Sequence, residues 1–168
     1  MPNAVQILAE GNEFRFCLEL ADPAAMPMDI AALNAEMDVF LELRQVEGDN
    51  ANALRIAIEE LLTNLVKFGS AAEVSPDAVL HAEGVVAIGD ADVRLTLSDD
   101  GRPFDPSRYP PPELDPETFL NRPPGGLGLH ILHQLFEDVQ YRRENQCNVA
   151  VWRRRRDAPT DLPPETLG

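Results

Sequence analysis

The sequence predicts an α+β fold of two layers, in which one largely antiparallel or mixed sheet has three helices on one face. The first observation is the length of 168 residues with 44% hydrophobic residues, which suits a single globular domain with a sizeable core. The second is the order of strand and helix patterns along the chain, β-α-α-β-β-loop-α-β-β. The third is that the helices are too few to connect all the strands as parallel neighbours, which leaves a mostly antiparallel sheet.

The first half of the domain is predicted to contain one strand and two helices. A period-two alternation predicts the strand over 13–21, and apolar residues at helical spacing predict the first helix over 28–46. The second helix begins near residue 49 and ends at Gly69, because glycine commonly terminates helices. The apolar stripe predicted for this second helix consists of Leu54, Ile58, Leu61, Leu65 and Phe68. Residues 1–11 are expected to form an N-terminal segment ahead of the domain.

The second half is predicted to add four strands and one helix. Two strands, over 78–89 and 92–101, are joined by a turn near Gly89. A third helix follows a glycine cluster, and a hairpin formed by 138–145 and 147–155 closes the domain.

Two further segments lack a helix or strand pattern. Residues 102–124 hold eight of the fifteen prolines of the chain, which forbids both a helix and an interior strand. A connection of this length inside a domain is typical of a functional lid or a disordered insert. The domain is therefore predicted to span 12–156, with a disordered tail over 157–168.

Charge and cysteine content disfavour several functions. The net charge of −15 disfavours direct binding to nucleic acid, and the basic run over 153–156 is interpreted as a strand end or a solvated tail. Cys17 and Cys147 match no zinc or redox spacing, so we expect buried free thiols in a reducing compartment. The chain shows no signal peptide and no apolar run of membrane-spanning length, which favours a cytoplasmic protein without membrane contact.

The second predicted helix contains two polar residues that suit phosphate chemistry. Glu60 and Asn64 are four residues apart, so both lie on one flank of the apolar stripe. The amide oxygen of an asparagine is a suitable ligand for Mg²⁺, and a nearby carboxylate can accept the proton of an attacking hydroxyl. The alternative for this pair is a solvated glutamate beside an ordinary polar asparagine.

Asp99 is predicted to lie on the core-facing side of a strand end. It continues the apolar face formed by Val93, Leu95 and Leu97. Burial of a carboxylate is costly unless a donor or a cation meets it, and the amino group of adenine would be such a donor. Gly101 would allow a ligand to approach the backbone closely. The alternative is that Asp99 only caps a turn.

Glycines precede the last predicted helix at positions 125, 126 and 128. The N–H groups at the start of a helix attract phosphate, and glycines allow the backbone to wrap around it. The stretch is neither a Walker A loop nor a Rossmann fingerprint, and a flexible hinge without a ligand is the alternative. His130 and His133 follow three residues apart, but no third metal ligand of suitable spacing accompanies them.

Taken together, the stretches EELLTN, SDDGRPFDP and GGLGLHIL resemble the N, G1 and G2 boxes of the GHKL ATPase superfamily, in their usual order. Within it, the chain is most similar to the bacterial anti-sigma factor serine/threonine kinases of the partner-switching type, over residues 12–156. The resemblance implies a Bergerat-type sandwich with an ATP lid over 102–124. Two positions depart from the family pattern. Pro103 replaces the second glycine of the G1 box, and KFG follows Leu65-Val66 where many relatives have a histidine and an aromatic residue.

The resemblance also implies roles for individual residues. Glu60 would be the general base, Asn64 the Mg²⁺ ligand, and Asp99 the acceptor for the adenine amino group, supported by Gly101. The remaining nucleotide-binding positions are expected at the start of the last helix, at Gly126, Leu127, Gly128 and Leu129.

The implied function is that of an anti-sigma factor serine/threonine kinase that uses ATP and Mg²⁺. Such a protein phosphorylates an anti-sigma factor antagonist and sequesters a sigma factor or another regulator, and the resemblance also implies a homodimer. One alternative is a binding module of the same fold that sequesters its partner without phosphotransfer. The other, the catalytic domain of a sensor histidine kinase, is disfavoured because no hairpin with a phospho-acceptor histidine precedes the N box.

Overall fold

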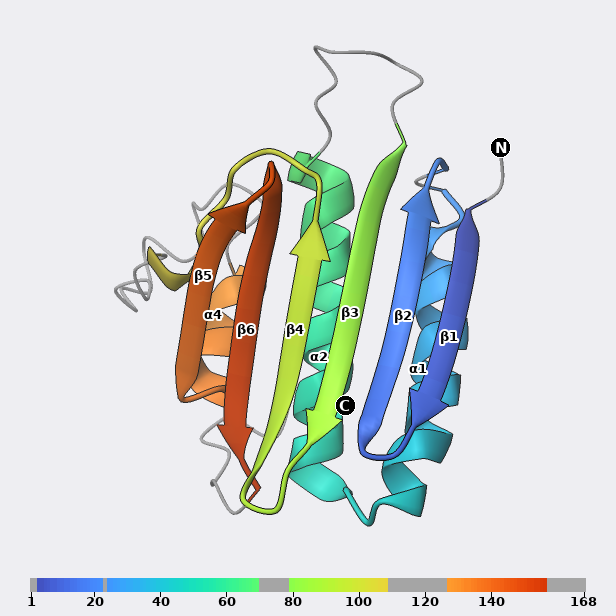
Figure 1. The fold of residues 1–168 in the computed structure, drawn as a ribbon, viewed down its shortest axis with the longest axis vertical. Helices are drawn as coiled ribbons and strands as arrows, with labels where there is room; N and C mark the ends of the chain where they lie inside the picture. Colours follow the sequence, from blue (N-terminus) through green and yellow to red (C-terminus); the bar gives the residue numbers. More distant parts are fainter. Residues whose placement is uncertain (1–2, 23, 70–78, 109–126, 157–168) are drawn as a thin grey trace.

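The computed structural model describes residues 3–22, 24–69, 79–108 and 127–156. They form a six-stranded antiparallel sheet in the order β1-β2-β3-β4-β6-β5, with three helices on one of its faces (Figure 1). The strands are β1 (Ala4–Glu10), β2 (Glu13–Leu20), β3 (Leu80–Ile88), β4 (Asp92–Asp99), β5 (Asp138–Glu144) and β6 (Cys147–Arg155). The helices are α1 (Met26–Leu43), α2 (Gly48–Asn64) and α4 (Leu127–Leu135). The predicted α+β fold is confirmed, and every described strand pair is antiparallel.

β1 is an edge strand that the sequence pattern did not reveal. It pairs with β2 along its whole length, from Ala4 opposite Glu19 to Glu10 opposite Glu13. Only Val5 of this strand is partly buried, so its hydrophobic alternation is weak. The segment that was expected ahead of the domain therefore forms an edge of the sheet.

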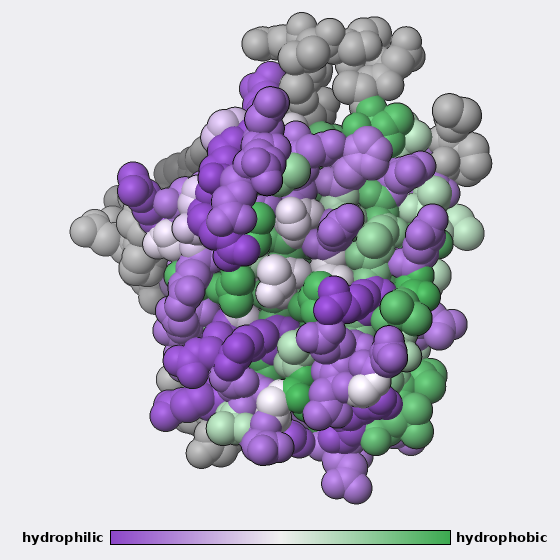
Figure 2. Space-filling model, viewed as in Figure 1, coloured by the Kyte–Doolittle hydropathy of each residue, from purple (hydrophilic) through white to green (hydrophobic). Residues whose placement is uncertain are grey.

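The core lies between the sheet and the helices. The inner face of β2 is fully buried, as its alternation predicted, and consists of Phe14, Phe16, Leu18 and Leu20. Gly84 of β3 lies directly beneath the ring of Phe16, and a side chain at this position would overlap that ring. The opposite face of the sheet is largely hydrophilic (Figure 2). The sheet is thus buried mainly on its helical side, which is typical of antiparallel sheets. Cys17 was expected to be buried but is exposed, because its neighbours Phe16 and Leu18 occupy the inner face of β2.

α2 does not continue to Gly69 as an α-helix. The α-helix ends at Asn64, and Leu65–Gly69 forms a π-helical turn (η1). A π turn holds more residues than an α turn, so the side chains after Leu65 rotate away from the predicted stripe. Leu65 is still buried, whereas Phe68, predicted to be buried, has 56% of its surface exposed. Turns of this kind occur frequently at functional sites.

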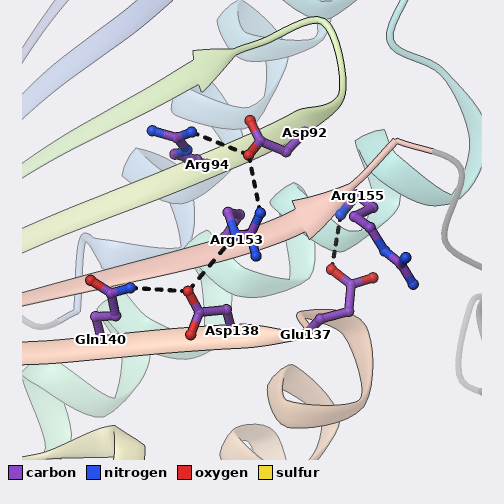
Figure 3. Close-up of polar contacts among 7 residues, drawn as sticks. All are labelled: Asp92, Arg94, Glu137, Asp138, Gln140, Arg153 and Arg155. Atoms are coloured by element: carbon purple, nitrogen blue, oxygen red, sulfur yellow. Dashed lines mark hydrogen bonds and ion pairs between the residues drawn. The ribbon is translucent and has the colours of Figure 1, made fainter.

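The arginine run over 153–156 is confirmed as a strand end and is engaged within the fold. Arg154 is buried and donates a hydrogen bond of 2.6 Å to the carbonyl oxygen of Leu135. Arg153 forms ion pairs with Asp92 at 3.6 Å and Asp138 at 3.8 Å, on the neighbouring strands (Figure 3). These contacts leave no open basic patch at Arg153 and Arg154. None of the helices in the described ranges is both long and apolar enough to cross a lipid bilayer.

Candidate functional site

A cavity of about 450 Å³ opens between the C-terminal end of α2 and the ends of β4 and β6. Its walls come from α2 and the π turn, from β4 and the segment that follows it, from α4, and from β6. Asn64, Asp99 and Leu129 all line it, although they belong to three separate sequence motifs. The fold therefore brings one residue of each predicted box to a single cavity of the size that small ligands occupy.

Asp99 lies at the last position of β4 with its carboxylate partly buried. The three apolar residues that share its face are buried, which confirms the predicted orientation of this strand. Burial raises the pKa of Asp99 above its ordinary value, and hydrogen bonds from Asn148 and Gly101 partly oppose that shift. Both hydrogen bonds reach Oδ1, at 2.8 Å and 3.0 Å. Within the described chain Oδ2 receives no hydrogen bond, so it can accept one from a ligand.

The turn after Asp99 has no room for a side chain at Gly101. A Cβ atom there would lie 2.8 Å from Asp99 Oδ1 and 3.2 Å from the Cα atom of Gly69. The backbone N–H of Arg102 donates to the carbonyl oxygen of Gly69 at 3.2 Å. Gly101 thus allows the end of β4 to pack against the π turn, in addition to any role toward a ligand.

Glu60 projects from α2 toward the start of α4 and is half-buried. Burial raises the pKa of its carboxyl group, the neighbouring Glu59 raises it further, and Lys67 lowers it. A Cβ atom at position 128 would overlap Glu60 Oε2, so the carboxylate rests directly against Gly128. A carboxyl group with a raised pKa beside a helix N-terminus is a suitable proton acceptor for chemistry at a bound phosphate.

The start of α4 provides the third part of the site. The helix begins at Leu127, so Gly128 lies in its first turn, where backbone N–H groups have no partner within the helix. Leu129 is buried and lines the cavity. Gly126, together with most of the expected lid over 102–124, lies outside the described residues.

The two histidines of α4 are engaged in contacts within the fold. His130 lies 3.1 Å from the side-chain nitrogen of Gln134, and His133 donates to the carbonyl oxygen of Pro106 at 2.9 Å. In the described ranges no three His, Cys, Asp or Glu side chains gather closely enough to hold a metal ion. Asn64, which is half-buried and lines the cavity, could bind Mg²⁺ together with the phosphates of a ligand.

The cavity residues that the sequence analysis missed include two aromatic residues and one amide. Phe68 and Phe104 both line the cavity, with 56% and 45% of their surfaces exposed, and offer apolar ring faces to a ligand. Asn148 also lines it, at the start of β6. An aromatic residue within the proline-rich segment was a signal for Phe104. No local pattern marked Asn148, whose partners Asp99 and Arg102 are more than forty residues away in sequence.

Comparisons with known proteins agree with the fold of this chain. The model of the family described as "Histidine kinase-like ATPase domain" matches residues 13–153. The fold is similar to a chain in the crystal structure of the SiaB–SiaC complex from Pseudomonas aeruginosa, with a TM-score of 0.52 and 12% sequence identity. That alignment covers 89% of this chain and 90% of the other. No curated protein matches the sequence.

Proposed function

Because the chain belongs to the histidine kinase-like ATPase domain family, we propose that it is an ATP-dependent serine/threonine protein kinase of a partner-switching system. In this proposal it phosphorylates an anti-sigma factor antagonist and sequesters a sigma factor or another regulator. The observation that carries the proposal is the convergence of Asn64, Asp99 and Leu129 on one cavity, with Glu60 beside the start of α4.

The adenine ring is assigned to the part of the cavity next to Asp99. Its amino group donates to Asp99 Oδ2, since the two hydrogen bonds from the described residues are made to Oδ1. Phe68 and Phe104 supply apolar contacts for the ring. Partial burial desolvates the carboxylate of Asp99 and raises its pKa, and a hydrogen-bond donor from the ligand would offset this loss of solvation.

The phosphates are assigned to the start of α4. Backbone N–H groups of its first turn have no partner within the helix, and the helix dipole favours negative charge there. Asn64 would hold Mg²⁺ through its amide oxygen, and the ion would supply positive charge that neutralises the phosphates.

Glu60 is assigned as the general base. Its carboxylate accepts the proton of a serine or threonine hydroxyl as the oxygen attacks the γ-phosphorus. The bond between the γ-phosphorus and the β–γ bridging oxygen breaks, and ADP leaves. The raised pKa of Glu60 brings its proton affinity closer to the range in which a base works at neutral pH.

A protein partner is part of the proposal. The structural neighbour was determined in a complex of SiaB with SiaC, which supports a protein partner for this chain as well. The net charge of −15 favours a partner with a basic contact surface. The proposed homodimer would use the edge strand β1, whose outer edge pairs with no other described strand.

The proposal is tested by incubating the chain with γ-labelled Mg-ATP and the antagonist candidate encoded beside its gene. We expect label on a serine or threonine of the candidate, and loss of that label with Glu60→Gln. Tight binding of ATP and of a sigma factor without any transfer would instead support the binding module without phosphotransfer, which Pro103 in the G1 box favours.

A further inference from the structure

A buried amide, that of Asn148 at the start of β6, connects the carboxylate of Asp99 to the segment that follows β4. We propose that Asn148 is a positioning residue that holds Asp99 and residues 101–104 as one unit, and thereby sets the affinity for adenine nucleotides. The inference rests on the proposed nucleotide site. It goes beyond that site by assigning a determinant of its affinity outside the three sequence boxes.

The amide of Asn148 meets a complementary group at each of its two ends. Nδ2 donates to Asp99 Oδ1 at 2.8 Å and to the carbonyl oxygen of Arg102 at 2.8 Å. Oδ1 accepts from the backbone N–H of Phe104 at 3.3 Å. An exchange of oxygen and nitrogen would oppose all of these contacts, so the surroundings fix the orientation of the amide. Only 5% of Asn148 is exposed, so water cannot readily replace a lost partner.

Two side chains of the edge strand β5 hold the same amide from the other side. The hydroxyl of Tyr141 donates to Asn148 Oδ1 at 2.9 Å, and Arg143 Nη1 donates to it at 2.7 Å. Arg143 Nη1 also lies 3.2 Å from the carbonyl oxygen of Gly101. Neither Tyr141 nor Arg143 lines the cavity. Their influence on a nucleotide therefore passes through Asn148 and the turn after Asp99.

The consequence for a ligand is geometric. Asn148 and Gly101 both donate to Asp99 Oδ1, and this directs Oδ2 toward a donor in the cavity. The same amide holds the backbone of Arg102 and Phe104, and the side chains of both residues line the cavity. Loss of the amide would release the acceptor and one wall of the pocket together, and a ligand would have to order both again.

The charge of the residue at position 148 matters as much as its shape. Aspartate is nearly isosteric with asparagine, but it would place a second carboxylate within hydrogen-bonding distance of Asp99. Two carboxylates so close cannot both ionise easily, and they share one proton instead. The other charged or titratable groups around this pair come from β4, the turn after it, and β5: Asp100, Arg102, Tyr141 and Arg143.

The test compares Asn148→Asp with the wild-type chain in the binding of a fluorescent ATP analogue with Mg²⁺, from about pH 5.5 to about pH 8. At the upper end, the variant should bind roughly tenfold to a hundredfold more weakly, because hydrogen bonds to a buried charge are lost and repulsion is added. The difference in affinity between the variant and the wild type should become smaller as the pH falls, since a protonated carboxyl group can donate in place of the lost N–H. A merely structural role of Asn148 would produce no such pH dependence.

Asn145→Asp is the matched control, because it makes the same chemical change at an exposed position in the turn of the same hairpin. It should bind the analogue like wild type at every pH. Tyr141→Phe removes one donor without adding charge and should weaken binding severalfold. A wild-type chain that binds no nucleotide would contradict the proposed function itself.

The positioning role is wrong if the wild type binds and Asn148→Asp either binds equally well or is weakened equally at every pH. If Asn148→Asp does not fold, Tyr141→Phe provides the test. An affinity of that variant equal to that of the wild type would contradict the positioning role of Asn148.

Discussion

Replacement of Gly128 by alanine is expected to displace the proposed general base while leaving the fold intact. The new Cβ atom would overlap Glu60 Oε2, so the carboxylate must retreat by about 2 Å to reach an ordinary contact of about 3.5 Å. The obstacle is the far end of a flexible side chain, and alanine is favoured over glycine in a helix by up to about 1 kcal/mol. We therefore expect the melting temperature to change by no more than about 2–4 °C.

The effect of Gly128→Ala on phosphotransfer should be far larger than its effect on stability. Loss of a correctly placed general base lowers the rate by a factor of roughly 10²–10⁴, which is about 3–5 kcal/mol of activation free energy. The assay is single-turnover transfer of labelled phosphate to the antagonist, with Glu60→Gln and the double variant measured beside it.

The double variant shows whether Gly128 acts through the carboxylate of Glu60. If it does, Gly128→Ala should add little to the loss already caused by Glu60→Gln. Full activity of Gly128→Ala would refute this reasoning. It would also be refuted if the rate reduction in the double variant equalled the product of the two single-variant reductions.

Three further predictions concern stability and binding. Glu60→Gln should raise the melting temperature of the ligand-free protein at neutral pH, because a raised folded-state pKa means that ionisation of Glu60 destabilises the native state. This increase in melting temperature should grow as the pH rises through the folded-state pKa of Glu60, and it should vanish below the ordinary glutamate pKa. Gly101→Ala should lower the free energy of unfolding, measured with denaturant, by about 1–3 kcal/mol, since its Cβ would lie 3.2 Å from the Gly69 backbone. The same substitution should weaken ATP binding. Leu54→Ala, at a fully buried position, should cost about 2–5 kcal/mol in the same unfolding experiment.

The sequence predicted the parts of the fold that have one strongly buried face. The alternation in β2 and the apolar residues of β4 were sufficient to predict both strands, because burial on one side imposes a strict period of two. β1 escaped prediction because an edge strand with a single partly buried residue leaves almost no such pattern. The π turn after Asn64 was missed for a different reason. Its apolar spacing also fits an α-helix, and only the exposed Phe68 reveals the wider turn.

The candidate site was predictable to the extent that its residues lie in local motifs. Glu60 and Asn64 share a helical flank, and Asp99 follows the parity of its strand, so their positions could be inferred from spacing alone. The contact of Glu60 with Gly128 joins two helices and has no local signature. Asn148 is equally invisible in the sequence, since its role depends on Asp99 of β4, which only the sheet order places beside β6.

The most direct test of the central claim is the thermal shift caused by Mg-ATP in the wild type and in Asp99→Asn. At a nucleotide concentration about 100 times above Kd, binding stabilises the folded chain by about 2.7 kcal/mol, which corresponds to a rise in melting temperature of roughly 5–10 °C. We expect this rise in the wild type and its loss in Asp99→Asn, because the substitution removes the carboxylate that accepts the adenine amino group. No shift in the wild type, or an equal shift in Asp99→Asn, would contradict the assignment of the cavity as an adenine nucleotide site.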